Sequence, residues 1–286
     1  MRDQHGRAMN RDDIPPASSF PAREENSSSF DTSTAHHARV YDYLLGGKDN
    51  FAADRSYVDT LTATYPGTVT TARANRAFLG RAVRFLATEA GISQFLDIGT
   101  GIPSPGNTQE AARDVRPDAR IVYVDNDPVV LAHARALLTS GEHGATDYLD
   151  ADIRKPEKIL QQAAATLDFT RPIGVLLLFI LHVIDDADDP HRIVATIMDA
   201  MPRGSYLALT HAAADLLDPG LEETAQEINR RMSAEQYICR DKAAVGRFFD
   251  GLEMVDPGLV RPEEWRPDPD APAVSTVIWA GVARKP

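Results

Sequence analysis

The sequence predicts an α/β fold built on a mostly parallel sheet, and three observations support this. From about residue 90 onward, short apolar runs alternate with amphipathic stretches, as in β-α units. Prolines stand at the start of several amphipathic stretches, where a helix needs no backbone N–H. The 286 residues are 43% apolar, which is enough to fill a sizeable core.

The chain is expected to divide into three parts. Residues 1–34 are polar and turn-forming without a helical or strand period, so burial cannot offset the entropy of ordering them and we expect a disordered tail. Residues 35–90 show helical periodicity and are expected to form a helical lid. Residues 91–286 hold the alternating pattern and are expected to form the main domain. His36 and His37, at the edge of the tail, are expected to be solvated.

Two helices are predicted in the segment 35–90. A short one carries Val40 and Leu44 at helical spacing and ends before Gly46 and Gly47, which suit a helix C-cap. A longer one is predicted over about 69–89. Its apolar stripe consists of Phe78, Ala82, Phe85 and Leu86, and its other face carries Arg73, Arg76, Arg81 and Arg84.

The elements of the main domain are predicted from the same patterns. Apolar runs predict strands at 95–98, 121–124, 147–149, 175–179 and 206–209. The stretches between them predict helices at about 107–115, 128–138, 156–166 and 190–200, and two more helices are predicted at 221–231 and 242–249. A strand at 252–255 and another within 274–283 have no helix between them, so we expect them to be antiparallel neighbours.

Net charge, the length of the apolar runs and the cysteine content limit the expected partners and location. The formal net charge is −12, and affinity for nucleic acid comes largely from clustered Lys and Arg, so we expect no nucleic-acid partner. The longest apolar run, 173–181, is shorter than the roughly 20 residues that cross a bilayer, so we expect no membrane association. The single Cys239 is compatible with a reducing cytoplasm, which is the expected location.

The motif Asp-Ile-Gly-Thr-Gly follows the first strand of the main domain. Ligands of α/β sheets bind at the carboxyl ends of strands, where glycines let backbone N–H groups come close to them. Asp97, Gly99, Thr100 and Gly101 are expected at that place. A dinucleotide cradle would read G-x-G-x-x-G, but Ser104 stands at its last position, and the carboxylate before the first glycine would repel a pyrophosphate. The motif therefore favours a cationic ligand without phosphates.

Acidic residues also end the next two strands. Asp125, followed by Asn126, is placed to accept the hydroxyls of a ribose, and Asp152 is placed to accept from the amine of an adenine. S-adenosylmethionine combines an adenine, a ribose and an amino acid that carries a sulfonium, and it is the predicted cofactor. The alternative is that these acids are ordinary turn and cap residues.

Five stretches carry a resemblance to a known family: ARVYDYLLGGKDNFAADR, RANRAFLGRAVRFL, QFLDIGTGIPSPGN, RIVYVDNDPVVLAHARALL and RFFDGLEMVDPGLV. From about residue 38 to 285 the chain is similar to the actinomycete-type family of S-adenosylmethionine-dependent methyltransferases. The resemblance implies the class I methyltransferase fold, which is Rossmann-like: a seven-stranded, mostly parallel sheet with an antiparallel last strand. The first loop of that class is Gly-x-Gly-x-Gly, and Pro103 stands at its third glycine here.

The segment 38–84 reverses the overall charge, with seven basic against four acidic side chains. We expect it to close over the cofactor, with Arg39 or Lys48 near the cofactor's carboxylate. Tyr43, one helical turn from Arg39, and Gly47 are expected to line the same pocket. The alternative is a solvated helix face that pairs with the acidic main domain.

Two histidines are candidate catalytic bases. Methyl transfer depends chiefly on holding the reacting groups in line, so no metal site is expected, but some acceptors must lose a proton. His182 follows the fourth strand of the main domain and His211 the fifth, and both are expected to face the cleft. For each, the alternative is a core histidine with a satisfied hydrogen bond.

The predicted function is that of an S-adenosylmethionine-dependent methyltransferase with a small-molecule acceptor. The sequence leaves open the acceptor, the methylated atom and the oligomeric state. Two alternatives remain: a non-catalytic S-adenosylmethionine-binding sensor or partner protein, and an NAD(P)-dependent oxidoreductase on a related sheet. A nucleic-acid methyltransferase is disfavoured by the charge and by FILH at 179–182, where an Asn/Asp-Pro-Pro-aromatic motif would stand.

Overall fold

The computed structural model describes residues 31–137, 144–233 and 237–286. Most of the tail predicted over residues 1–34 therefore lies outside the described residues. At the start of the described chain, the backbone carbonyls of Asp31 and Thr34 accept hydrogen bonds from the Arg39 guanidinium.

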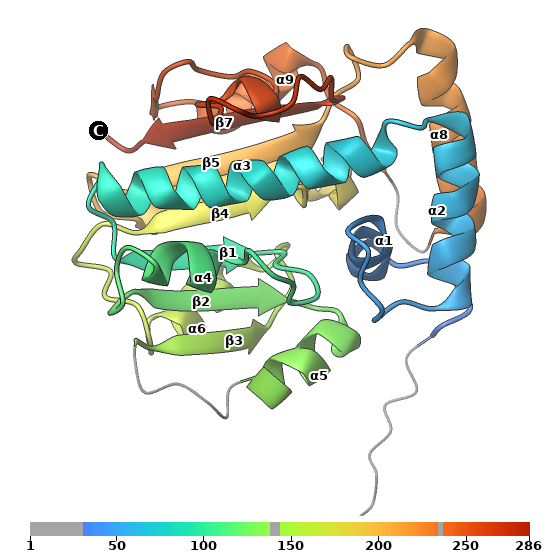
Figure 1. The fold of residues 1–286 in the computed structure, drawn as a ribbon. Coiled ribbons are helices and arrows are strands. Elements are labelled where there is room, and N and C mark those ends of the chain that lie inside the picture. Colours follow the sequence, from blue (N-terminus) through green and yellow to red (C-terminus); the bar gives the residue numbers. More distant parts are fainter. Residues whose placement is uncertain (1–30, 138–143, 234–236) are drawn as a thin grey trace, which may run out of the picture. The chain divides into compact units, whose positions relative to one another are not determined.

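A seven-stranded sheet in the order β3-β2-β1-β4-β5-β7-β6 forms the centre of the fold (Figure 1). Its strands are β1 (Gln94–Ile98), β2 (Arg120–Asp125), β3 (Thr146–Asp150), β4 (Gly174–Leu178), β5 (Tyr206–Ala212), β6 (Glu253–Met254) and β7 (Ile278–Arg284). Neighbouring strands from β3 to β5 are parallel, whereas β7 is antiparallel to both β5 and β6. The expected class I methyltransferase sheet, with its antiparallel last strand, is confirmed.

Helices connect the strands as the sequence predicts, with boundaries that differ by a few residues. They are α1 (His37–Leu44), α2 (Ala52–Thr64), α3 (Thr68–Thr88), α4 (Thr108–Arg113), α5 (Pro128–Leu137), α6 (Pro156–Ala163), α7 (Pro190–Ala200), α8 (Pro219–Met232) and α9 (Lys242–Gly246). Short 3₁₀ turns are η3 (Leu181–Val183), η4 (Asp186–Asp188), η5 (Arg247–Phe249) and η6 (Pro262–Glu264). The helix predicted at 242–249 is α9 continued by η5.

The strands of the parallel part are apolar on both sides because helices cover both faces of the sheet. Within β1, Leu96 packs into the core shared with α6 and α7, and the adjacent Phe95 packs into the core under α3 and α4. The alternation of side chains along a strand thus distributes one continuous apolar run between two cores. This is why the runs predict strands although they do not alternate between apolar and polar.

One helix, α2, was not predicted from the sequence. Only three of its residues are buried, Asp54, Tyr57 and Val58, so its apolar periodicity is weak. Its start carries a local signal, because the Asp54 carboxylate accepts a hydrogen bond from the Phe51 backbone N–H at 2.7 Å. Figure 1 shows α2 beside α8, beyond the carboxyl ends of the parallel strands.

The basic face expected on α3 is not uniformly solvated. Arg81 is buried, and its guanidinium donates to the backbone carbonyls of Trp265 and Pro262 at 3.0 and 2.6 Å. Arg73 is exposed, as expected for a solvated face. None of the described helices is both long enough and apolar enough to cross a membrane.

Two matched substitutions test how the sheet is stabilised. Val122 in β2 is fully buried, whereas Val115 after α4 is 36% exposed. Val122→Ala is expected to lower the free energy of unfolding by about 2 kcal/mol or more, because two methyl groups lose their burial and leave a cavity. Val115→Ala is expected to change it by less than about 0.5 kcal/mol. Urea denaturation measures both, and equal effects would contradict the core assignment.

Candidate functional site

The carboxyl ends of three neighbouring strands form an acidic edge of the sheet. Asp97 lies in β1, Asp125 is the last residue of β2, and Asp152 follows β3. Because these strands are adjacent in the order β3-β2-β1, their ends meet at one place.

Two cavities open at this edge and share part of their walls. The first, called the acidic cavity below, has among its lining residues Asp97, Gly99, Thr100, Gly101 and Asp125. The second, called the edge cavity, has among its lining residues Gly99, Asp125, Asn126 and Asp152. The acidic cavity comprises about 840 Å³ of space between the side chains, part of it open to solvent. The fold thus brings all seven predicted sheet-edge residues to two adjoining cavities.

The turn after β1 requires glycine at its first position. Gly99 has φ +76°, and a Cβ there would lie 2.6 Å from Cγ1 of Ile180 in the segment after β4. Any side chain would therefore meet both an unfavourable backbone conformation and a steric clash. This close packing leaves the backbone of Gly99 exposed to both cavities.

Asp125 connects two loops at the cavity. Its Oδ2 accepts from the Gly101 N–H at 2.8 Å, and its Oδ1 accepts from the Asp127 N–H at 2.9 Å. Desolvation raises the pKa of the Asp125 carboxyl, and these two hydrogen bonds oppose that rise. Each carboxylate oxygen retains a lone pair, so the side chain can still accept hydrogen bonds from a ligand.

Asp97 is the most deeply buried acid of the cavity. Its Oδ2 accepts from the Thr108 hydroxyl at 2.7 Å. Burial raises the pKa of Asp97 to about 6, while the Thr108 hydrogen bond and the charge of Arg76 act in the opposite direction. The carboxyl is therefore mainly ionised at neutral pH, in surroundings that favour a cation beside it.

Arg76 brings a permanent positive charge into the acidic cavity. It lies on α3, and its guanidinium donates to the Ser104 hydroxyl at 2.7 Å and lies 6.0 Å from the centre of the Tyr41 ring. The sequence placed it only among the basic residues of a helix face. No local signal distinguishes it from Arg73, because the position of α3 over the sheet decides which of the two reaches the cavity.

The start of the helical segment covers the acidic cavity, but with residues other than those predicted. The lining residues from this part of the chain are His36, His37, Ala38 and Tyr41. His37 and Tyr41 are four positions apart and lie on one side of α1. Arg39, Tyr43, Gly47 and Lys48 are not among the lining residues of either cavity.

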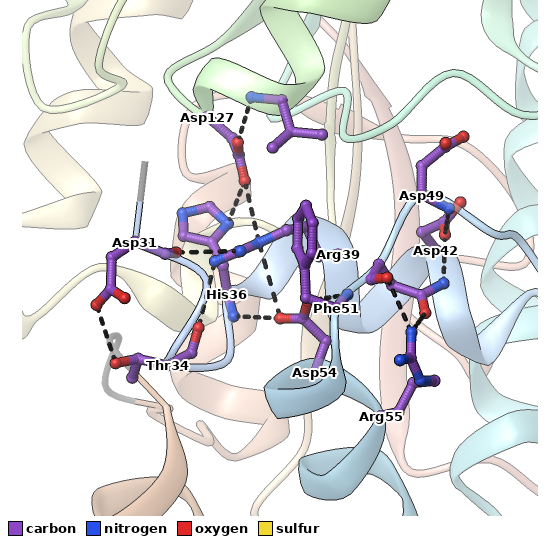
Figure 2. A network of polar contacts seen from close by, with 12 residues as sticks. Asp31, Thr34, His36, Arg39, Asp42, Asp49, Phe51, Asp54, Arg55 and Asp127 are labelled. Carbon is purple, nitrogen blue, oxygen red and sulfur yellow. Dashed lines mark hydrogen bonds and ion pairs between the residues drawn. The ribbon is translucent and has the colours of Figure 1, made fainter. Parts of the chain in front are cut away.

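Arg39 is buried in a network of polar contacts on another side of α1 (Figure 2). Its guanidinium donates to the carbonyls of Asp31 and Thr34, and its Nε lies 3.7 Å from Asp54 Oδ1 and 3.8 Å from Asp127 Oδ2. Asp54 also accepts from the backbone N–H of His36 at 3.0 Å. Arg39 therefore links the start of the described chain to α2 and to the loop after β2.

The other three residues predicted in this segment have structural surroundings of their own. Tyr43 packs against the apolar cluster of α1, α2 and α3, and Lys48 is exposed. Gly47 lies against the Asp42 carboxylate, where a Cβ would overlap its Oδ1. The helical phase of α1 explains the difference from the prediction, because residues spaced with Arg39 point away from the side that carries His37.

His36 and His37 are not the solvated pair that the sequence suggested. His36 Nδ1 lies 2.7 Å from Asp127 Oδ2, and His37 Nε2 lies 2.9 Å from the Phe179 carbonyl oxygen. Burial raises the pKa of Asp127, but the hydrogen bond and charge of His36, together with the Val129 N–H and the charge of Arg39, lower it overall. The two histidines hold α1 against the loop after β2 and the end of β4.

The two predicted bases are both buried. His211 accepts from Arg240 Nη1 at 2.8 Å through Nε2, so its Nδ1 donates to the Ala212 carbonyl at 2.8 Å. Burial lowers the pKa of His211 to about 3. His211 lines neither cavity, contrary to the expectation that it faces the cleft, because its hydrogen bonds turn it toward Arg240.

His182 lies behind one wall of the acidic cavity. Its ring centre is 4.1 Å from that of Phe179, which lines the cavity, and 4.8 Å from that of His37. Neither ring nitrogen has a hydrogen-bond partner among the described residues. Burial lowers the pKa of His182 well below its usual range, so the imidazole is neutral. His182 itself lines neither cavity.

The family model described as S-adenosyl methyltransferase matches residues 23–286. The chain belongs to this family. S-adenosylmethionine, the cofactor predicted from the acidic strand ends, is confirmed by that membership. No curated protein matches the chain.

Two solved structures are similar to this chain over most of its length. A protein of the DUF574 family from Streptomyces avermitilis shares 41% sequence identity, with a TM-score of 0.84, over 90% of this chain and 99% of its own. A protein from Thermobifida fusca, provisionally named a methyltransferase, shares 42% identity, with a TM-score of 0.83, over 89% of this chain and 96% of its own. The resemblance to an actinomycete-type methyltransferase family is thus confirmed.

The buried Asp97 is expected to make stability depend on pH. Since its pKa is about 6 in the native state and near 3.8 when unfolded, the native state holds a proton between about pH 4 and pH 6 that the unfolded state has released. The contribution of Asp97 to stability therefore falls as pH rises through this window.

Asp97→Asn tests this directly, because the amide oxygen can still accept from Thr108. When the pH is raised from 4.5 to 7, the free energy of unfolding of the wild-type protein is expected to fall by on the order of 1 kcal/mol more than that of Asp97→Asn. Urea denaturation at both pH values provides the measurement. Parallel pH dependences of the two proteins would show that burial does not raise the pKa of this carboxyl.

Proposed function

We propose that this family member transfers the methyl group of S-adenosylmethionine, bound across the carboxyl ends of β1, β2 and β3, to a small-molecule acceptor. The observation that carries this proposal is the pair of adjoining cavities with Asp97, Asp125 and Asp152 along one edge and Arg76 opposite. The S-adenosyl methyltransferase family supplies the reaction type, and the acceptor is part of the proposal.

The residues present fit the parts of the cofactor. Asp125 would accept hydrogen bonds from the ribose hydroxyls. Asn126 and Asp152 in the edge cavity would face the adenine. In the acidic cavity, Asp97 would face the ammonium group, and Arg76 would bind the carboxylate. Gly99 lines both cavities, so its backbone can lie directly against the cofactor. Once bound, the cofactor supplies a methyl group on a sulfonium, and the chain's task is to orient it and to exclude water.

We assign the segment 35–90 the role of a lid and residues 91–286 that of the cofactor-binding domain. The support is that His37, Ala38 and Tyr41 of α1 form part of the wall of the acidic cavity. The contacts of His36 with Asp127 and of His37 with Phe179 would keep the lid closed. Arg39 stabilises the lid in this interpretation rather than binding the cofactor.

The alternatives make different demands on the site. An oxidoreductase would have to place a pyrophosphate beside Asp97 and Asp125, where two carboxylates would repel it. A sensor or partner protein would use the same cofactor cavity, so binding alone does not separate it from an enzyme. A small-molecule acceptor is favoured over a polynucleotide by the net charge of −12.

Arginine substitutions on α3 test how the cofactor is held. Arg76→Ala is expected to weaken S-adenosylhomocysteine binding by about 10- to 100-fold, because charge-assisted hydrogen bonds to the carboxylate are lost. Binding of methylthioadenosine, which has no amino acid portion, is expected to change less than about threefold. Arg73→Ala, at an exposed position of the same helix, is the control and should affect neither ligand. Calorimetric titration gives all the affinities.

Two outcomes would count against this assignment. Equal losses for both ligands in Arg76→Ala would mean that the arginine does not contact the amino acid portion. Competition by NADH at concentrations similar to those of S-adenosylhomocysteine would favour the oxidoreductase and reject the methyltransferase.

We retain His182 as the proposed base and set His211 aside. His182 is neutral, has no hydrogen-bond partner among the described residues and lies against Phe179, whereas the ring of His211 is engaged by Arg240 and the Ala212 carbonyl. A neutral imidazole can take the proton that the acceptor loses, and that of His182 packs against Phe179 in the wall of the acidic cavity.

His182→Phe keeps a ring in this position and removes the nitrogens. It is expected to leave the affinity for S-adenosylhomocysteine within about threefold and to lower the transfer of labelled methyl groups into an actinomycete cell extract by about 10²-fold or more. Scintillation counting of the products measures transfer. If the variant transfers methyl groups at the native rate, His182 has only a packing role.

A further inference from the structure

A third cavity lies on the other side of α1 and α3 from the acidic cavity, and it has a different chemical character. It is called the apolar cavity below, and its lining comes from α1, α2, the start of α3, the ends of β4 and β5, and α8. It comprises about 860 Å³ of space between the side chains, part of it open to solvent.

The apolar cavity adjoins the acidic cavity through shared structural elements. On α1, His37 and Tyr41 line the acidic cavity, whereas Val40 and Leu44 line the apolar cavity. On α3, Asn75 and Arg76 face the first, and Thr68, Thr71 and Ala72 face the second. The two helices thus form a partition with a polar and an apolar side.

Phe179 is the residue that lines both cavities. It follows β4 and has φ +56°, a strained conformation for a residue with a bulky side chain. Its backbone is held at both ends, because its N–H donates to the Thr210 carbonyl at 3.2 Å and its carbonyl lies 2.9 Å from His37 Nε2. The strain is therefore maintained at the point where a methyl group would pass from one cavity to the other.

The described lining of the apolar cavity includes no Asp, Glu, Lys, Arg or His side chain. Its polar groups are phenols, hydroxyls, one amide and one thiol. Burial raises the pKa of Tyr57 to about 12 and also raises the pKa of Tyr65, so both phenols stay neutral at physiological pH. A charged ligand would lose its hydration here without meeting an opposite charge, which costs several kcal/mol.

We propose that the apolar cavity binds the methyl acceptor, and that the acceptor is a neutral, mainly apolar small molecule with a nucleophilic hydroxyl or similar group at the end that faces Phe179. This inference rests on the proposed methyltransferase function and specifies its substrate class. The acceptor's lone pair forms the bond to the methyl carbon while the carbon–sulfur bond breaks and its electron pair stays on sulfur. The proton that the acceptor loses is taken by the neutral imidazole of His182, the proposed base, and passes from there to water.

The test uses N-phenylnaphthylamine, a neutral fluorophore that brightens in apolar surroundings. Ala225→Trp on α8 and Leu61→Trp on α2 place a large ring in the apolar cavity, and each is expected to weaken binding of the probe at least tenfold. Thr224→Trp and Thr60→Trp are exposed neighbours on the same helices and are expected to leave the affinity within about threefold. Two substitutions on different helices keep the test meaningful if one variant fails to fold.

A matched pair of ligands tests the chemical class. A naphthol is expected to displace the probe at least tenfold more strongly than the hydroxynaphthoic acid that differs from it by one carboxylate, because the carboxylate would be buried without a partner. With S-adenosylmethionine bound, an interligand nuclear Overhauser effect is expected between its S-methyl protons and the naphthol ring.

The outcomes separate this inference from the proposed function. Equal displacement by the two ligands or unchanged probe affinity in both filled variants would overturn the assignment of the apolar cavity. A missing interligand effect would overturn it as well when titration shows that S-adenosylmethionine is bound. None of these results involves S-adenosylhomocysteine, whose titration reports on the cofactor cavity alone. Failure of that titration would reject the proposed function, even with the probe bound as expected.

Discussion

The hydrogen bonds to the Asp125 carboxylate organise the rest of the site. Through Gly101 they hold the turn after β1, and through Asp127 they hold the loop after β2. Asp127 in turn receives His36, so the position of the N-terminal helix over the cavity depends on the same loop. Burial raises the pKa of both Asp97 and Asp125, which means that the fold keeps two carboxylates where their charge is costly. Such a cost is typical of sites that bind a cation, because the ligand removes it.

The helices α1 and α3 are amphipathic in a way that differs from ordinary surface helices. A surface helix normally separates core from solvent, whereas α1 and the start of α3 separate a polar cavity from an apolar one. The basic residues that give the segment 38–84 its positive charge have different surroundings. Arg39 and Arg81 are buried and donate hydrogen bonds to backbone carbonyls, and Arg73 is solvated. Arg76 alone of these four reaches the acidic cavity. The excess of positive charge therefore has several separate causes, and the count by itself does not identify a binding residue.

Hydrogen bonding separates the roles of the two buried histidines. The ring of His211 is engaged by Arg240 and a backbone carbonyl, as a core residue would be. The ring of His182 is surrounded by those of Phe179, His37 and Tyr237, and each of these three residues lines the acidic or the apolar cavity. His36 and His37 make contacts between elements far apart in the chain, and a sequence pattern cannot reveal such contacts because both partners are polar and neither is periodic.

The sequence by itself determined the order of strands and helices, the mostly parallel sheet and the row of acids at its edge. These are local properties: apolar runs, proline and glycine positions, and residues placed directly after strands, whose ends a parallel sheet brings together. Only the tertiary structure decided that Arg76 and not Arg39 or Lys48 faces the acidic cavity, that α1 covers it with His37 and Tyr41, and that an apolar cavity lies beyond Phe179. The physical reason is that the phase of a helix and its position over a sheet depend on packing between distant segments, which leaves no trace in local periodicity.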